Sequence, residues 1–145
     1  MSKEELLLAA LASAKGSSFS PVQIQKLLFL IDRRIGRDIG GPFFDFIPYK
    51  FGPFDKGIYD SLDLLVKEKF IAEVSTKNSK WKQYKLTSSG QSKGEKFLAS
   101  ISRKPHLEVC DLSKYVLKMS FHDLVAAIYR DYPDMQVRSI FKAVL

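Results

Sequence analysis

The chain contains 145 residues, 46% of them hydrophobic, with 23 basic and 16 acidic side chains. That size and composition favour a single domain over residues 1–145, with a core at 20–104 and a helical extension at 105–145. The lone cysteine, Cys110, excludes an internal disulfide and is expected to be a buried structural residue. No apolar run is long enough to cross a membrane, so a cytoplasmic protein without membrane contact is expected.

The first predicted helix starts near the N-terminus. Ser2 and Glu5 have the spacing of a capping box, in which each side chain bonds the backbone N–H of the other residue. The apolar segment 6–12 follows two glutamates, and this acidic start argues against a secretory leader. We expect a short amphipathic helix that packs on the core.

A second helix is predicted from Ser20, which can form a capping box with Gln23, while Pro21 suits the first helical position. Gly36 is expected to end it. One face of this helix should be buried, because its apolar residues recur every three to four positions: Ile24, Leu27, Leu28, Ile31 and Ile35.

An aromatic strand is predicted within residues 44–51, and Pro48 restricts it to a short or edge strand. We expect the Gly52-Pro53 pair to stop this strand and Pro53 to open the next helix. That third helix should run from Asp55, with Ile58, Leu62, Leu65 and Val66 on its buried face.

Residues 71–74 and 81–86 are predicted to form an antiparallel hairpin around a polar connection at 75–80, and Thr87 can cap a further helix. This order predicts an α+β, mostly helical fold: a winged helix with a small antiparallel hairpin and additional N- and C-terminal helices. The tail should form helices within 107–119 and 124–129. Winged-helix proteins often pair through terminal helices, so a homodimer is possible by analogy.

The basic excess is concentrated in one stretch, because residues 67–104 contain ten basic and three acidic side chains. Such asymmetry indicates a site for a polyanion. If Trp81 faces the core, Lys80 and Lys82 should face water together. A lysine surface that only maintains solubility is an equally good interpretation. The predicted contacts to DNA phosphates are Lys77, Lys80, Lys82, Lys85, Lys93 and Lys96.

The third predicted helix is poorly suited to the DNA major groove. It should expose Asp55, Asp60 and Asp63, which would meet phosphates unfavourably. Two modes of binding therefore remain: shallow contact with DNA through the basic hairpin, or recognition of a protein.

Aromatic residues are unusually dense between 43 and 59, and they are too many for one small core. The aromatic residues that the core cannot cover would be exposed, and they would mark a partner site. The alternative is that the Gly52-Pro53 turn has only a structural role. The predicted partner-binding residues are Tyr49, Phe51, Pro53, Phe54 and Tyr59.

Catalysis is not expected. His106 and His122 are the only histidines, and their spacing does not suit a metal site on one helix. There is also no glycine-rich phosphate loop. We therefore predict no enzymatic activity, no catalytic or metal-binding residues and no cofactor.

Four segments of the sequence together carry a resemblance to a known family: Gln25–Leu30, Tyr49–Pro53, Tyr59 with Leu62–Ile71, and Tyr84–Gly90. Together they resemble the Panacea antitoxin domain, and Ile128–Pro133 is similar to the tail of the related YwgA-like winged-helix proteins. The resemblance implies a mostly helical, non-catalytic module that neutralises a toxin by binding it, in a toxin–antitoxin or phage-defence setting.

Two functions follow as hypotheses. The favoured one is a nucleic-acid-associated regulator that contacts DNA phosphates through a basic wing. The alternative is an antitoxin-like module that binds a partner protein, such as a toxin or a defence component.

Overall fold

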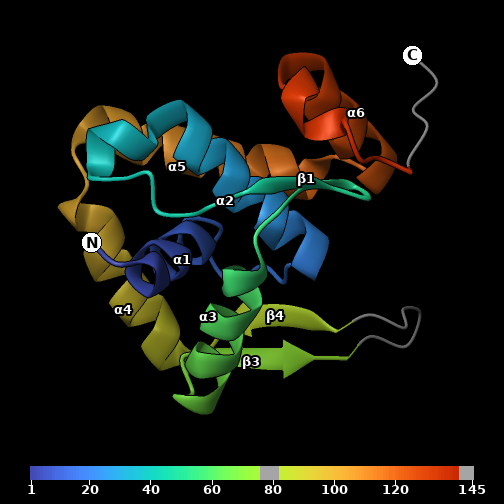
Figure 1. Ribbon diagram of the computed structural model, residues 1–145. Coiled ribbons are helices and arrows are strands. Elements are labelled where there is room, and N and C mark those ends of the chain that lie inside the picture. The colour runs from blue at the N-terminus through green and yellow to red at the C-terminus, as the bar shows by residue number, and fades with distance from the viewer. Residues whose placement is uncertain (76–81, 141–145) are drawn as a thin grey trace.

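The computed structural model describes residues 1–75 and 82–140, so Lys77, Lys80 and Trp81 lie outside the described residues. The described part is an α+β arrangement in which helices surround a buried N-terminal helix and two small antiparallel hairpins project from the helices (Figure 1). The helices are α1 (Lys3–Ala12), α2 (Pro21–Ile35), α3 (Lys56–Lys67), α4 (Ser88–Ser100), α5 (Arg103–Lys118) and α6 (Phe121–Asp131). The hairpins pair β1 (Ile47–Tyr49) with β2 (Gly52–Phe54) and β3 (Ile71–Val74) with β4 (Gln83–Leu86).

Helix α1 is the centre of the core and not an amphipathic surface helix. Its predicted capping box is confirmed, but every residue of Leu6–Ala12 is buried. The prediction of an amphipathic helix was wrong because α1 contacts α2, α3, α4 and α5, which leaves it no solvent face. The contact with α4 is especially close, because Gly94 packs against the backbone carbonyl of Leu8.

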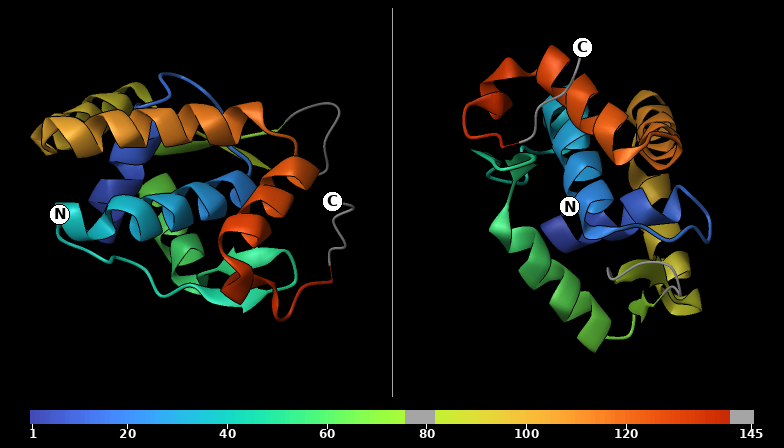
Figure 2. Two further views of the ribbon diagram at one scale, coloured as in Figure 1. Left: turned by 90° about the horizontal axis from the view of Figure 1, so that it is seen from above. Right: turned by 90° about the vertical axis from the view of Figure 1, so that its right-hand side faces the viewer.

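Helix α2 forms as predicted. It begins with the Ser20–Gln23 capping box and ends at Ile35, before a short 3-10 turn at Gly36–Ile39. Figure 2 shows α5 lying beside α2, with α6 crossing close to both. The tail after Pro105 contributes Val109 and Val116 to the same hydrophobic core as α1 and α2.

The segment around Gly52 differs from its prediction. Gly52 and Pro53 do not stop the strand and open a helix; they form β2, which pairs with β1 around a two-residue turn at Lys50 and Phe51. Gly52 closes this turn with a φ of 102°, a conformation that glycine adopts readily. Pro48 and Pro53 lie directly opposite each other. Antiparallel strands contain such pairs that exchange no hydrogen bonds, so neither proline lacks a needed donor.

Helix α3 starts at Lys56, and Asp55 is its N-cap residue. The prediction that Asp55 is exposed was wrong, because its side chain turns inward to cap the helix. After α3, the predicted β3–β4 hairpin is confirmed over the described residues, and Thr87 caps α4 as expected. An isolated bridge joins Phe19 to Tyr84, with both backbone N–H···O distances at 2.8 Å, so the segment before α2 lies beside β4.

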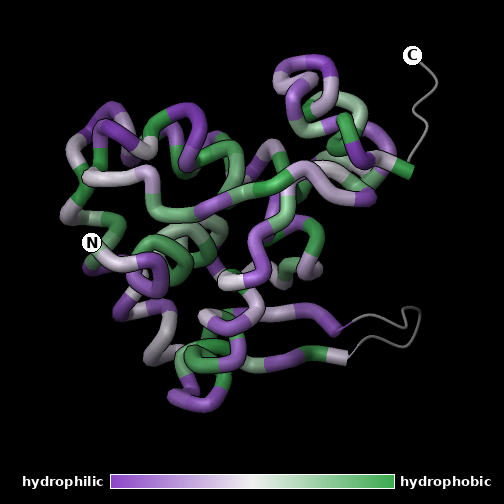
Figure 3. The backbone as a smooth tube through the Cα atoms, in the orientation of Figure 1, coloured by the Kyte–Doolittle hydropathy of each residue, from purple (hydrophilic) through white to green (hydrophobic). Residues whose placement is uncertain are grey.

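Hydrophilic and hydrophobic residues alternate along the helices (Figure 3), and most of the buried positions are apolar. None of the helices in the described ranges has the length and apolar character needed to span a membrane.

Candidate binding surfaces

Three aromatic rings from the β1–β2 hairpin and α3 form a continuous series. The ring centroids of Tyr49 and Phe54 are 5.1 Å apart and nearly stacked, and those of Phe54 and Tyr59 are 5.7 Å apart. Tyr49 and Tyr59 are 41% and 37% exposed, and Ile47, which pairs with Phe54, is 47% exposed. We call Ile47, Tyr49, Phe54 and Tyr59 the aromatic surface. It brings together three of the five predicted partner-binding residues.

The other two predicted partner-binding residues lie differently. Pro53 is buried where β2 contacts α2, so the prediction that it contacts a partner was wrong. Phe51 is exposed in the hairpin turn, but its ring packs edge-on against Phe121 of α6, with centroids 5.5 Å apart. Phe51 therefore connects the hairpin to α6 and does not extend the ring series.

Gln25 of α2 ties the hairpin to α3. Its side-chain amide donates to the Asp55 carbonyl at 2.9 Å and accepts from the Asp55 backbone N–H at 3.0 Å. The Asp55 carboxylate accepts from the backbone N–H of Gly57 at 2.7 Å and of Asp45 at 2.8 Å. These buried bonds hold both ends of the hairpin against the start of α3, and so set the spacing between Phe54 and Tyr59.

Lys26 is a second buried anchor. It is only 4% exposed, and its ammonium donates to the Pro53 carbonyl at 3.2 Å. Burial lowers the pKa of Lys26 to about 8, because desolvation disfavours the charged form. Sequence reasoning missed the roles of Gln25 and Lys26. The available signal was that both polar residues lie among the buried apolar positions of α2.

The predicted lysine contacts are only partly brought together. Lys82 is paired with Glu73 at 3.2 Å, on the strand face that carries Tyr84, whereas Lys85 is on the opposite face. The two lysines of α4 are exposed, and Lys93 lies over the Phe70 ring at 4.3 Å. Lys77 and Lys80 lie outside the described residues. Lys85 and Lys93 thus flank the start of β3, which keeps shallow phosphate contact possible at this end of the molecule.

The exposed side of α3 carries acidic charge next to the aromatic surface. Asp60 and Asp63 are both exposed, whereas Asp55 is not. A tyrosine hydroxyl is protonated near neutral pH, and burial raises the pKa of Tyr59 further, so this hydroxyl can donate a hydrogen bond to a partner.

No group of three or more His, Cys, Asp or Glu side chains is placed to hold a metal ion within residues 1–75 and 82–140. His106 packs into the core side of α5, where its Nδ1 lies 3.0 Å from the Leu98 carbonyl. Cys110 is half-buried against the core.

No model of a known protein family matches the chain, and no curated protein matches it either.

Proposed function

We propose that this chain is a non-catalytic binding module that recognises a partner protein through its aromatic surface. The observation that carries the proposal is the ring series Tyr49–Phe54–Tyr59, with centroid separations of 5.1 and 5.7 Å, on a well-anchored but exposed support. Aromatic side chains are the residues most enriched in the centres of protein interfaces. The backbone that carries these rings is already fixed by Gln25 and Lys26, so it loses little conformational entropy on binding.

The proposed arrangement of elements is that of a winged helix. Its support is the order α1, α2, α3, β3, β4 together with the Phe19–Tyr84 bridge, which takes the place of a short third strand. In this interpretation α3 occupies the position of the recognition helix. It presents Tyr59, Asp60 and Asp63, a combination that suits a protein surface better than DNA phosphates. The resemblance to antitoxins makes a cytoplasmic toxin or defence component the class of partner to test first.

A second candidate function is nucleic-acid association. The specific observation in its favour is that Lys69, Lys85 and Lys93 are exposed around the Phe70 turn, at the end of the molecule where the basic stretch was predicted. These side chains would contact phosphates without reading bases.

The experiment that tests the main proposal is affinity capture from the native host with quantitative mass spectrometry. The variant Tyr49→Ala/Tyr59→Ala is compared with Leu107→Ala/Val137→Ala, which removes exposed apolar side chains outside the aromatic surface. We expect one protein to be enriched by the unaltered chain and by the control variant, and to be lost with the tyrosine variant. Equal enrichment with all three would contradict the proposal, provided that circular dichroism shows all three to be folded.

A further inference from the structure

A groove follows helix α5 on the side that faces α2 and α6. Its central cavity, of about 430 Å³, lies between these three helices. A second cavity of about 640 Å³ shares Arg34 and Glu108 with the first and continues toward the start of α5. A third, of about 270 Å³, shares Tyr115 and Ala127 with the first and continues toward the end of α5. Because they share lining residues, the three cavities lie next to one another along α5, which is about 24 Å long, and we call this row of cavities the groove.

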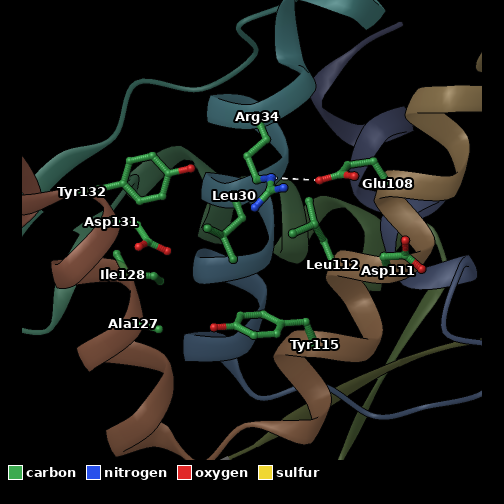
Figure 4. A pocket seen from close by; sticks show the side chains of 10 residues that line it. All are labelled: Leu30, Arg34, Glu108, Asp111, Leu112, Tyr115, Ala127, Ile128, Asp131 and Tyr132. Atoms are coloured by element: carbon green, nitrogen blue, oxygen red, sulfur yellow. Dashed lines mark ion pairs between the residues drawn. The ribbon is translucent and has the colours of Figure 1, made fainter.

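The floor of the groove is apolar and its two walls are polar. Figure 4 shows Asp131 and Tyr132 on the α6 side, Glu108 and Tyr115 on the α5 side, and residues of α2 between them. The floor is made by Leu30, Leu112 and Ile128. Tyr115 lies at the rim and is 38% exposed.

The charge of the groove is opposite to that of the molecule. The residues that line the three cavities include five carboxylates and three permanently basic side chains, on a chain whose net charge is +7. Two bases and two carboxylates are paired with each other, because Arg34 lies 2.8 Å from Glu108 and Arg130 lies 3.2 Å from Asp131, and three carboxylates and Lys104 lie outside these two pairs. The five carboxylates are Asp38, Glu108, Asp111, Asp123 and Asp131.

We propose that this groove binds a basic amphipathic segment of a partner protein, at a site separate from the aromatic surface. Apolar side chains of the segment would cover Leu30 and Leu112, and its lysine or arginine side chains would reach Asp111, Asp131 and the Tyr115 ring. The length of the groove suits a helix laid along α5. Phosphates would meet carboxylates here, so the groove does not suit a nucleic acid.

The test uses a fluorescein-labelled 14-residue peptide with leucine and lysine at helical spacing, titrated with the full chain by fluorescence anisotropy. The informative variant is Asp111→Asn/Asp131→Asn. Its matched control is Asp60→Asn/Asp63→Asn, which removes the same charge from α3. We expect saturable binding that weakens about tenfold in the first variant and less than about twofold in the control. A peptide with glutamine in place of lysine is expected to bind at least about tenfold more weakly.

Three outcomes would overturn the proposal: no saturable binding of the lysine peptide, equal weakening in the two double variants, or equal binding of the glutamine peptide. Equal weakening would mean that the peptide responds to the overall charge and not to the groove. The variant Tyr49→Ala/Tyr59→Ala should bind the peptide as the unaltered chain does. The experiment therefore distinguishes a failure of the proposal for the groove from a failure of the proposal for the aromatic surface.

Discussion

Lys26 has an unusual position for a lysine, because it is buried and its ammonium donates to a backbone carbonyl instead of to a carboxylate. Its ammonium bonds the Pro53 carbonyl, and its stem passes below Gly52, where a Cβ would lie 3.6 Å from the Lys26 Cε. Desolvation disfavours the charged ammonium, so the burial of Lys26 opposes folding. We interpret Lys26 as an anchor: its burial lowers the free energy of unfolding, but its hydrogen bond holds the β1–β2 hairpin in a fixed position.

This interpretation predicts how stability depends on pH. The pKa of Lys26 is about 8 in the folded chain and 10.5 in an unperturbed lysine. Below pH 8 the side chain is protonated in both states, so the burial penalty is fully present. Between the two pKa values the unfolded chain binds more protons, and stability therefore rises with pH. Relative to Lys26→Met, the unaltered chain should gain about 2 kcal/mol between about pH 7.5 and pH 10.

Urea unfolding of both chains at the two pH values measures this difference, and the tyrosines, which are common to both, cancel from it. A difference that does not change with pH would mean that Lys26 is not held as a desolvated ammonium.

Asp55 acts at the same scale, because one carboxylate joins two segments by accepting from Gly57 and Asp45. Asp55→Ala leaves two backbone N–H groups without their acceptor, so we expect a loss of about 2 kcal/mol in the free energy of unfolding. Asp60→Ala, one turn along on the exposed side, should change it by less than about 0.5 kcal/mol. Chemical denaturation of the two variants checks this, and equal effects would contradict the capping role.

At the scale of elements, α1 and α4 are packed so closely that glycine is required between them. A Cβ on Gly94 would lie 2.4 Å from the Leu8 carbonyl oxygen and 2.7 Å from the Ala12 Cβ. Gly94→Ala improves helix propensity by about 1 kcal/mol, but it forces the two helices apart. We expect a net loss of about 2 kcal/mol. Ser92→Ala, on the exposed side of α4, should be neutral or slightly stabilising.

Thermal unfolding of both α4 variants measures the effect. If Gly94→Ala were at least as stable as Ser92→Ala, the close approach of α1 and α4 would be contradicted.

The elements that could be predicted from the sequence are those whose ends are determined locally. The caps at Ser2, Ser20 and Thr87 depend on hydrogen bonds within three residues, so the pattern alone identifies them. The β1–β2 hairpin was missed because Gly52-Pro53 is also a common breaker. Its role here depends on Gln25 and Lys26, which are distant in the sequence.

The candidate site shows the same division. Aromatic density predicted an exposed patch, because seven rings exceed what one small core can cover. Which residues join the aromatic surface depends on tertiary contacts: the Phe51 ring packs on Phe121 of a helix some seventy residues later, and Pro53 is buried. Predicting the lysine set needed the strand register, which places Lys82 beside Glu73 and Lys85 on the opposite face.

At the scale of the whole molecule, charge and aromatic character are separated over the surface. Exposed lysines gather around the start of β3 and α4, acidic side chains line the groove along α5, and the aromatic surface lies on the β1–β2 hairpin and α3. The three surfaces therefore do not overlap, so the partners that we propose would not compete for one surface.

The lysine end makes a prediction of its own. Any affinity for a random-sequence DNA duplex should fall steeply with salt, because each neutralised phosphate releases counterions. Lys85→Glu/Lys93→Glu should abolish it, while Lys56→Glu/Lys114→Glu, with the same change in charge elsewhere, should weaken it less. Fluorescence anisotropy at low and moderate salt measures both effects. Identical losses of DNA affinity in the two variants would mean that binding depends on the net charge of the chain and not on the positions of Lys85 and Lys93.

The most direct test of the central claim is amide hydrogen exchange on the chain in complex with the partner that it captures. Our account predicts slowed exchange within residues 47–59, in the β1–β2 hairpin and the start of α3, where the aromatic surface would be covered. Slowed exchange confined to residues 71–75 and 82–96, with no change at 47–59, would contradict it.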